Sequence, residues 1–173
     1  MRKTQPKLAE LDPVWAKIRS EAEVAVQEEP LLGAFLHKNV LQHVTIENAL
    51  AHRISLKLAS LEMSEQYLRE FCNRAFANDN TLAASARADI MATYDRDPAC
   101  HRFLQPLLYF KGFQAVQAYR IAHFMWISGQ RDIAYFMQSR VSEVFGIDIH
   151  PNAKIGQGLM IDHAHSIVIG ETA

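Results

Sequence analysis

The stretch IHPNAKIGQGLMIDHAHSIVIGETA, residues 149–173, contains isoleucines spaced six residues apart. These are Ile149, Ile155, Ile161 and Ile167. A period of six fits neither the 3.6-residue repeat of a helix face nor the two-residue alternation of a strand. It is typical of a parallel β-helix built from hexapeptides, in which one aliphatic side chain of each hexad points into the core. A β-rich loop with its isoleucines in register by chance is the alternative. Gly156 favours the β-helix, because glycine suits a coil corner.

The repeat reaches only Ala173, which leaves few hexads for a self-contained solenoid. Each repeat buries its apolar face against its neighbours, so roughly three or more stacked units are needed for stability. A last strand with an unpaired edge also invites pairing with another chain. We therefore expect this sequence to be the front part of a longer protein or a deliberately shortened form of one.

The composition predicts a globular structure with its own hydrophobic core. Of the 173 residues, 49% are hydrophobic and 21% are charged, which suits one or two small domains. The net charge of −1 argues against a nucleic-acid or anionic-membrane partner, because such partners require a basic excess. The apolar run 121–127 is too short to span a bilayer, and residues 1–10 lack the apolar segment of a signal peptide. Cys72 and Cys100 have neither metal-site nor disulfide-framework spacing, which predicts a reducing, cytoplasmic location.

Residues 1–146 are predicted to form an all-helical N-terminal domain. Apolar residues recur there at helical spacing in successive segments, separated by prolines, glycines and polar turns. The predicted helices run from about Leu11 to Pro30, from Pro30 to Leu41, from Thr45 to Leu58, from Ser64 through Ala75, from Thr81 to near Asp97, from Gly112 to Ser128, and from Arg131 to Phe145. Residues 98–108 have an irregular pattern. Residues 147–173 then begin the incomplete β-helix, so the predicted fold class is α+β.

The segment 112–128 is apolar on nearly all sides. A helix with this pattern is buried, either by its own domain or by a partner subunit. Together with the apolar faces of the first helices, it raises a second functional hypothesis, an oligomerisation module rather than a catalyst.

The start of the predicted β-helix is rich in ionisable side chains, namely Asp148, His150, Asp162, His163, His165 and Glu171. A histidine beside a carboxylate is the usual form of a general base, because the carboxylate fixes the tautomer and stabilises the imidazolium. Metal binding by the three histidines is a rival hypothesis, and so is a polar solenoid surface without function. In a coil of three hexads residue 145 lies under His163, so Asp148 is displaced laterally by roughly 10 Å. The two can meet only where the first coil is irregular.

Three strings give a more specific indication. They are DIMATYDRDPA at 89–99, LLYFKGFQAVQAYRIAHFMW at 107–126, and DIHPNAKIGQGLMIDHAHSIVIGETA at 148–173. With them, the sequence resembles the serine O-acetyltransferases over nearly its whole length. The resemblance implies a left-handed parallel β-helix of hexapeptide repeats. It also implies transfer of an acetyl group from acetyl-CoA, a co-substrate, to the hydroxyl of L-serine, which gives O-acetylserine for cysteine biosynthesis, with no bound cofactor and no metal.

The family pattern implies roles for individual residues. By resemblance, His163 is the general base for the serine hydroxyl and Asp148 is its orienting carboxylate. Asp97 and Asp162 match the acidic residues that hold the ammonium group of the amino acid. His165 stands, with the serine after it, where relatives often carry small residues, and the resemblance gives it no role.

In the family, a second active-site histidine, a neighbouring arginine and most of the CoA groove lie downstream of the position of Ala173. The resemblance therefore implies that this chain alone has little or no activity, because it can neither position the thioester nor stabilise the oxyanion. It also implies trimers formed along the solenoid and joined into hexamers by the helical domains. The tail by which the family binds O-acetylserine sulfhydrylase is absent from this sequence.

Substrate binding by this chain is expected to be weak. Asp97 and Asp162 should lie close together, because an ammonium group needs converging carboxylates. A basic partner for the substrate carboxylate is not evident in the sequence, and one unpaired charge of the zwitterion is costly to desolvate. We therefore expect L-serine, and L-cysteine as feedback inhibitor in the same pocket, to bind weakly or not at all.

Overall fold

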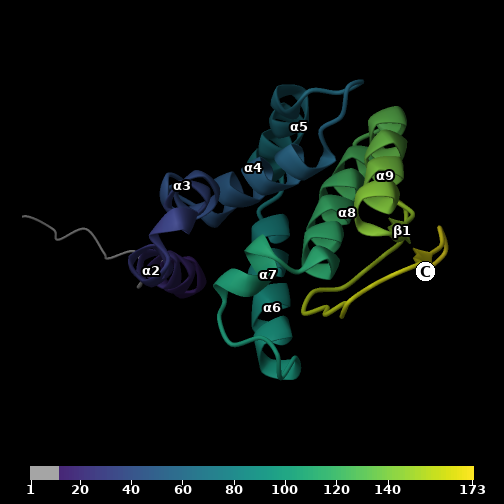
Figure 1. The fold of residues 1–173 in the computed structure, drawn as a ribbon. Helices are drawn as coiled ribbons and strands as arrows, with labels where there is room; N and C mark the ends of the chain where they lie inside the picture. The colour runs from purple at the N-terminus through teal and green to yellow at the C-terminus, as the bar shows by residue number, and fades with distance from the viewer. Residues whose placement is uncertain (1–11) are drawn as a thin grey trace, which may run out of the picture.

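The computed structural model describes residues 12–173, which Figure 1 shows as a run of helices followed by a short β segment. The helical elements are α2 (Pro13–Glu28), η1 (Pro30–Leu32), α3 (Gly33–Leu36), η2 (His37–Leu41), α4 (Ile46–Leu58), α5 (Glu65–Asn78), α6 (Thr81–Arg96), α7 (Leu104–Leu108), α8 (Lys111–Ile127) and α9 (Arg131–Phe145). The strands are β1 (Ile147–Ile149) and β2 (Ile167–Ile169). This order confirms the predicted fold class, an all-helical segment that leads into the start of a parallel β structure. Leu11, predicted in the first helix, lies outside the described residues. None of the described helices combines the length and apolar character needed to cross a membrane.

Side-chain caps start α2, α4 and α5. Asp12 accepts a hydrogen bond from the backbone N–H of Trp15 at 2.9 Å at the start of α2. Thr45 and Ser64 cap α4 and α5 in the same way, at the starts that the sequence predicted. These oxygens pair backbone donors that the first turn of a helix leaves free. At the far end of the helical region, Gly146 terminates α9 in the left-handed conformation, with φ 70°.

The prediction of a single helix over 30–41 is wrong. The segment is divided into a 3-10 turn, one α-helical turn and one π-helical turn, η1, α3 and η2. Asn39 donates from its side-chain amide to the carbonyl of Phe35 at 2.8 Å, which offers that carbonyl an alternative to the regular ladder. The N–H of Gln42 bonds to the carbonyl of His37, five residues back, at 3.0 Å, as in a π turn.

The stretch 98–108, predicted to be irregular, includes the short helix α7. Pro106 falls in the first turn of α7, where its missing N–H would have no intrahelical partner. Leu104, Leu107 and Leu108 are at most 1% exposed. Burial of these leucines stabilises a helix that is too short to persist by itself.

Helix α8 packs along α9, as Figure 1 shows, and it also contacts α4, α5, α6 and α7. All its residues from 112 to 122 are buried. Even the polar side chains of Gln114, Gln117 and Arg120 are no more than 7% exposed. The predicted burial of this segment is confirmed, and within residues 12–173 its own chain provides the cover.

The C-terminal residues make one turn of a parallel coil. β1 pairs in parallel with β2, and Ile147 lies opposite Ile167, 20 residues later. This coil is therefore longer than three ideal hexads. Ile149 is buried, and Ile155, Ile161 and Ile167 are half-buried against the hydrophobic core. The hexad isoleucines thus pack inward, as the period of six predicted.

Helices α6 and α8 are tied to this coil by a buried ion pair. Asp89 on α6 is fully buried and lies 2.8 Å from Arg120 on α8. Arg120 also donates to the carbonyl of Gly156 at 2.8 Å, and Asp89 accepts the backbone N–H of Leu159 at 2.8 Å. The helices thereby cover one end of the coil, in the way that a capping element covers a solenoid end.

Candidate active site

A cavity of about 650 Å³ lies between the end of α6, the start of α8 and the coil segment 160–165. Its wall combines apolar side chains with two carboxylates, two histidines and one lysine. The residues are Thr93, Asp97, Ala99, Tyr109, Phe110, Lys111, Gly112, Met160, Ile161, Asp162, His163 and His165. A cavity of this size with a few convergent polar groups is typical of a small-molecule site.

Asp97 directly follows α6, which ends where Pro98 was predicted to end it. Its carboxylate oxygen Oδ1 accepts the backbone N–H of Ala99 at 2.8 Å, which fixes the side chain in the turn. Oδ2 has no hydrogen-bond partner among the residues that the structure describes. This oxygen is therefore available to accept a hydrogen bond from a ligand.

Asp162 and His163 stand on a turn of the coil, residues 162–166. The side chain of His163 is 95% exposed, and its φ of 46° lies in the left-handed region that few non-glycine residues adopt. Its Nε2 is 3.6 Å from Oδ1 of Asp162. Both residues line the same cavity as Asp97. The chain therefore brings together three of the four residues that the family resemblance selected.

Asp148 lies apart from this group. It is on β1, where its Oδ1 accepts a hydrogen bond from the side-chain amide of Gln138 on α9 at 2.7 Å. It lines a separate pocket with residues of α9. In the strand register it faces Val168, five residues beyond His163. The first coil is irregular, as the pairing of Asp148 with His163 required, but the irregularity does not bring the two together in this chain.

Lys111 is a functional candidate that the sequence reasoning missed. It is the first residue of α8 and lines the cavity beside the two carboxylates. Its Nζ lies 3.0 Å from Nδ1 and 3.1 Å from Nε2 of His165. A basic partner for the substrate carboxylate was not evident in the sequence, and the structure places Lys111 on the same cavity as Asp97 and Asp162. The contact of Lys111 with His165 joins positions 54 residues apart in sequence, which no local pattern reveals.

His150 lies away from the other two coil histidines. Its ring packs edge-on against Trp126 and Tyr135, with centroids 5.2 Å and 5.8 Å away. The described residues contain no group of three or more histidine, cysteine or acidic side chains that is placed to hold a metal ion. The three-histidine arrangement of the rival metal hypothesis is thus not formed by this chain.

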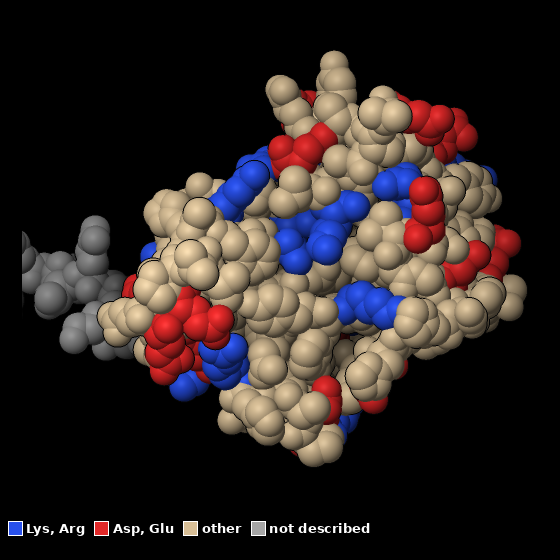
Figure 2. All heavy atoms as spheres, viewed as in Figure 1, with Lys and Arg blue, Asp and Glu red and all other residues tan. Residues whose placement is uncertain are grey.

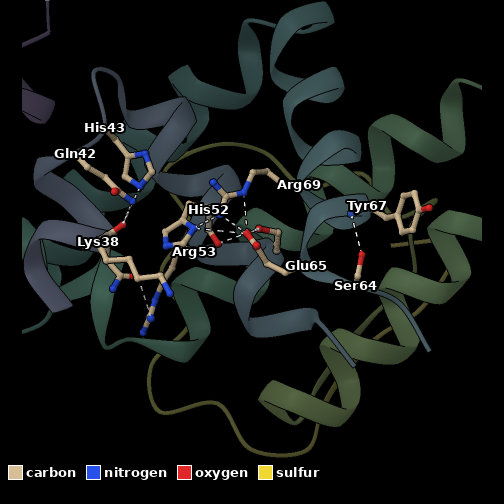
Figure 3. Close-up of polar contacts among 11 residues, drawn as sticks. Lys38, Gln42, His43, His52, Arg53, Ser64, Glu65, Tyr67 and Arg69 are labelled. Atoms are coloured by element: carbon tan, nitrogen blue, oxygen red, sulfur yellow. Dashed lines mark hydrogen bonds and ion pairs between the residues drawn. The ribbon is translucent and has the colours of Figure 1, made fainter. Parts of the chain in front are cut away.

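A second polar cluster lies inside the helical region, where η2, α4 and α5 meet. Figure 3 shows Glu65 and Arg69 directed toward His52, and we call these three residues the His52 cluster. The Nε of Arg69 donates to Glu65 at 2.7 Å. His52 is 2% exposed, and its burial, reinforced by the positive charge of Arg69, lowers its pKa to about 4. The cluster shares no residue with the cavity. Because folding favours the neutral ring of His52, the cluster should make the folded state less stable at acid pH.

Figure 2 shows charged side chains of both signs on this face, with some basic ones near its middle and acidic ones beside basic ones toward its margins. This distribution agrees with the net charge of −1. A nucleic-acid interface would instead gather basic residues along one face or one helix.

The chain matches the family described as "Serine acetyltransferase, N-terminal" over residues 14–118. It is 48% identical to the serine acetyltransferase of Salmonella typhimurium over 164 residues, which are 95% of this chain and 60% of the relative. The chain belongs to the serine acetyltransferase family.

Two solved structures extend this comparison within the serine acetyltransferase family. The enzyme of Brucella abortus in complex with coenzyme A is 44% identical, with a TM-score of 0.92 over 96% of this chain and 67% of that one. The enzyme of Neisseria gonorrhoeae in complex with serine is 47% identical, with a TM-score of 0.90 over 92% of this chain and 66% of that one. The present chain spans about 60% of the length of the Salmonella serine acetyltransferase.

Proposed function

We propose that the protein is a serine O-acetyltransferase, which transfers the acetyl group of acetyl-CoA to the hydroxyl of L-serine. The product, O-acetylserine, would serve cysteine biosynthesis, with L-cysteine as feedback inhibitor. The observation that carries the proposal is the cavity that gathers Asp97, Asp162 and His163 in a chain of this family. Relatives solved with coenzyme A and with serine support the choice of substrates.

The first chemical task falls to His163. Its imidazole takes the proton of the serine hydroxyl as the oxygen attacks the thioester carbonyl of acetyl-CoA. The resulting tetrahedral oxyanion collapses, the carbon–sulfur bond breaks, and the thiolate of CoA leaves and is protonated. The exposed ring beside the cavity is suited to this task, because no protein group other than Asp162 is paired with it among the described residues.

The second task, holding the amino acid, falls to Asp97 and Asp162. An ammonium group in a partly enclosed cavity needs anionic partners, and these two carboxylates line the same wall. The free Oδ2 of Asp97 offers one acceptor, and the half-exposed carboxylate of Asp162 offers another.

Asp148 is proposed as the orienting carboxylate of His163, with a condition. In the single chain it pairs with Gln138, so the catalytic pair requires movement of the turn 162–166 or the approach of a second copy. A homotrimer along the β-helix, joined into a hexamer by the helical regions, would supply such a copy. The outer edge of β2 and the 74% exposed Val168 support continued pairing at this end.

The domain organisation that goes with this function has two parts. We propose residues 1–146 as the helical domain and residues 147–173 as the first, incomplete coil of a left-handed β-helix of hexapeptide repeats. The oxyanion donors, the CoA groove and a tail for O-acetylserine sulfhydrylase belong to downstream parts in the family. A cytoplasmic location fits the two buried free thiols, Cys72 and Cys100.

A chimera tests the proposed activity. Residues 1–173 would be joined to the downstream part of the Salmonella typhimurium relative and assayed for thiol release from acetyl-CoA with and without L-serine. We expect serine-dependent release by the chimera and little or none by residues 1–173 alone. Asp97→Asn in the chimera should raise the KM for L-serine by about tenfold or more, since it removes one charge-assisted contact. A chimera that folds but releases no thiol would overturn the proposal.

A second candidate function is an oligomerisation module, favoured by the open edge of β2. Light scattering on residues 1–173 separates the possibilities. An oligomer in solution supports the module, and a monomer at micromolar concentration contradicts it.

A further inference from the structure

The start of α8 and the coil segment before His163 are in direct backbone contact. A Cβ added at Gly112 would lie 2.1 Å from the carbonyl oxygen of Ile161 and 3.0 Å from its carbonyl carbon. Real side chains do not tolerate such a distance, so only glycine permits this approach. The contact fixes the start of α8 against the residue that precedes the turn 162–166.

The side chain before Gly112 makes the next contact along the turn. The Nζ of Lys111 lies 3.0–3.1 Å from the two ring nitrogens of His165. Lys111 forms no ion pair with any carboxylate in residues 12–173. Because Nζ is almost equally far from both ring nitrogens, it lies over the face of the imidazole, where the ring's π electrons attract a cation. The imidazole is therefore the partner that holds the lysine over the turn.

The turn itself needs external support. His163 and Ser166 both have positive φ, 46° and 55°, a conformation that is unfavourable for residues with a Cβ. Such residues persist where their surroundings over-determine the backbone. Ala164, between them, is 3% exposed and anchors the inner side of the turn. The contact between Lys111 and His165 anchors the outer side.

We propose that Lys111 and His165 are a positioning pair that holds the turn 162–166 on α8 and thereby sets the direction of His163 over the cavity. This assigns a role to His165, to which the family resemblance gave none. The inference rests on the proposed function only in naming His163 as the base. The positioning itself is a claim about the conformation of the turn.

Nuclear magnetic resonance on isotope-labelled residues 1–173 tests the pair without an activity assay. Lys111→Met should raise the amide exchange rate of Ala164 about threefold, the effect of losing one contact between a cation and a ring face at an exposed position. It should also shift the ring signals of His163. Lys111→Arg keeps the charge and the donors and should restore both readouts. Lys154→Met, a lysine of the same coil outside the cavity, is the matched control and should change neither.

The partner residue provides the second arm. His165→Thr should reproduce the effects of Lys111→Met, and the double variant should add nothing further, because either change removes the same contact. Unchanged His163 signals in both single variants, or additive effects in the double variant, would overturn the proposal. A loss of thermal stability with no local change at the turn would also overturn it. An inactive chimera combined with the expected spectra would refute the acetyltransferase function and leave the positioning pair standing.

Discussion

The helical region and the first coil differ in how far their key ionisable side chains are buried and paired. Asp89 is fully buried, and it accepts hydrogen bonds from Arg120 and from the backbone of Leu159. On the coil, the side chain of His163 is 95% exposed, and its Nε2 lies 3.6 Å from a carboxylate oxygen of Asp162. A buried charge is tolerated only when it is paired, whereas an exposed and sparsely paired group keeps its lone pairs for a ligand. Ionisable side chains therefore stabilise the fold in the helical region, whereas those on the coil are free to contact a ligand.

The largest effect should come from breaking the buried ion pair. Asp89→Ala leaves the charge of Arg120 buried without its partner, which costs about 3–5 kcal/mol of the free energy of unfolding. Urea denaturation measures this cost. Glu143→Ala is the control, because Glu143 is 68% exposed in its ion pair with Arg140, and it should cost less than about 1 kcal/mol. Equal costs for the two variants would remove the contrast between buried and exposed charges.

A smaller loss is expected where the two regions touch. Gly112→Ala places a methyl group against the backbone of Ile161 and should lower the free energy of unfolding by about 1–3 kcal/mol. The sign is informative, because alanine is otherwise the better helix former by about 1 kcal/mol. Gly156→Ala meets open space and should stay within about 0.5 kcal/mol of the parent. A Gly112→Ala protein more stable than the parent in the same urea series would disprove the close approach.

The His52 cluster predicts a dependence of stability on pH. Folding lowers the pKa of His52 from 6.5 to about 4, so the folded state favours the neutral ring. Stability is complete above pH 6.5 and is lost as the pH falls toward 4, because the unfolded chain takes up the proton first. Linkage gives a loss of about 2 kcal/mol between pH 7.5 and pH 5. Burial lowers the pKa of His43 too, which adds in the same direction.

A substitution isolates this contribution. His52→Gln should flatten the fall in stability between pH 7.5 and pH 5, measured by urea denaturation at each pH. The carboxylates of Asp12 and Glu65 have lowered pKa values, so their loss of stabilisation lies at more acid pH and does not enter this window. An unchanged slope in the His52→Gln protein would show that other groups cause it.

The sequence predicted those helix boundaries that depend on interactions between residues close together in the chain. The starts at Thr45 and Ser64, the stop before Pro98 and the burial of α8 all follow from caps, proline geometry and periodicity. The division of residues 30–41 was missed, because the side-chain bond of Asn39 competes with the backbone ladder and no periodicity records it.

The site was predicted less completely than the fold. The family resemblance selected Asp97, Asp148, Asp162 and His163. The structure places all of these except Asp148 on one cavity, and Asp148 pairs with Gln138 on α9 instead. The resemblance did not indicate Lys111, because the meeting of Lys111 with His165 depends on how α8 docks on the coil. Docking of this kind is fixed by contacts distant in sequence, which a single sequence leaves open.

We expect His163 to act on the substrate and not on the fold. In the chimera, His163→Ala should lower kcat/KM by at least about 100-fold, the usual contribution of a general base. In residues 1–173 the same change should alter the free energy of unfolding by less than about 0.5 kcal/mol, because the side chain is exposed. His101→Ala, at another exposed histidine outside the cavity, should leave the rate unchanged. A His163→Ala chimera with the rate of the His101→Ala chimera would show that His163 is not the general base.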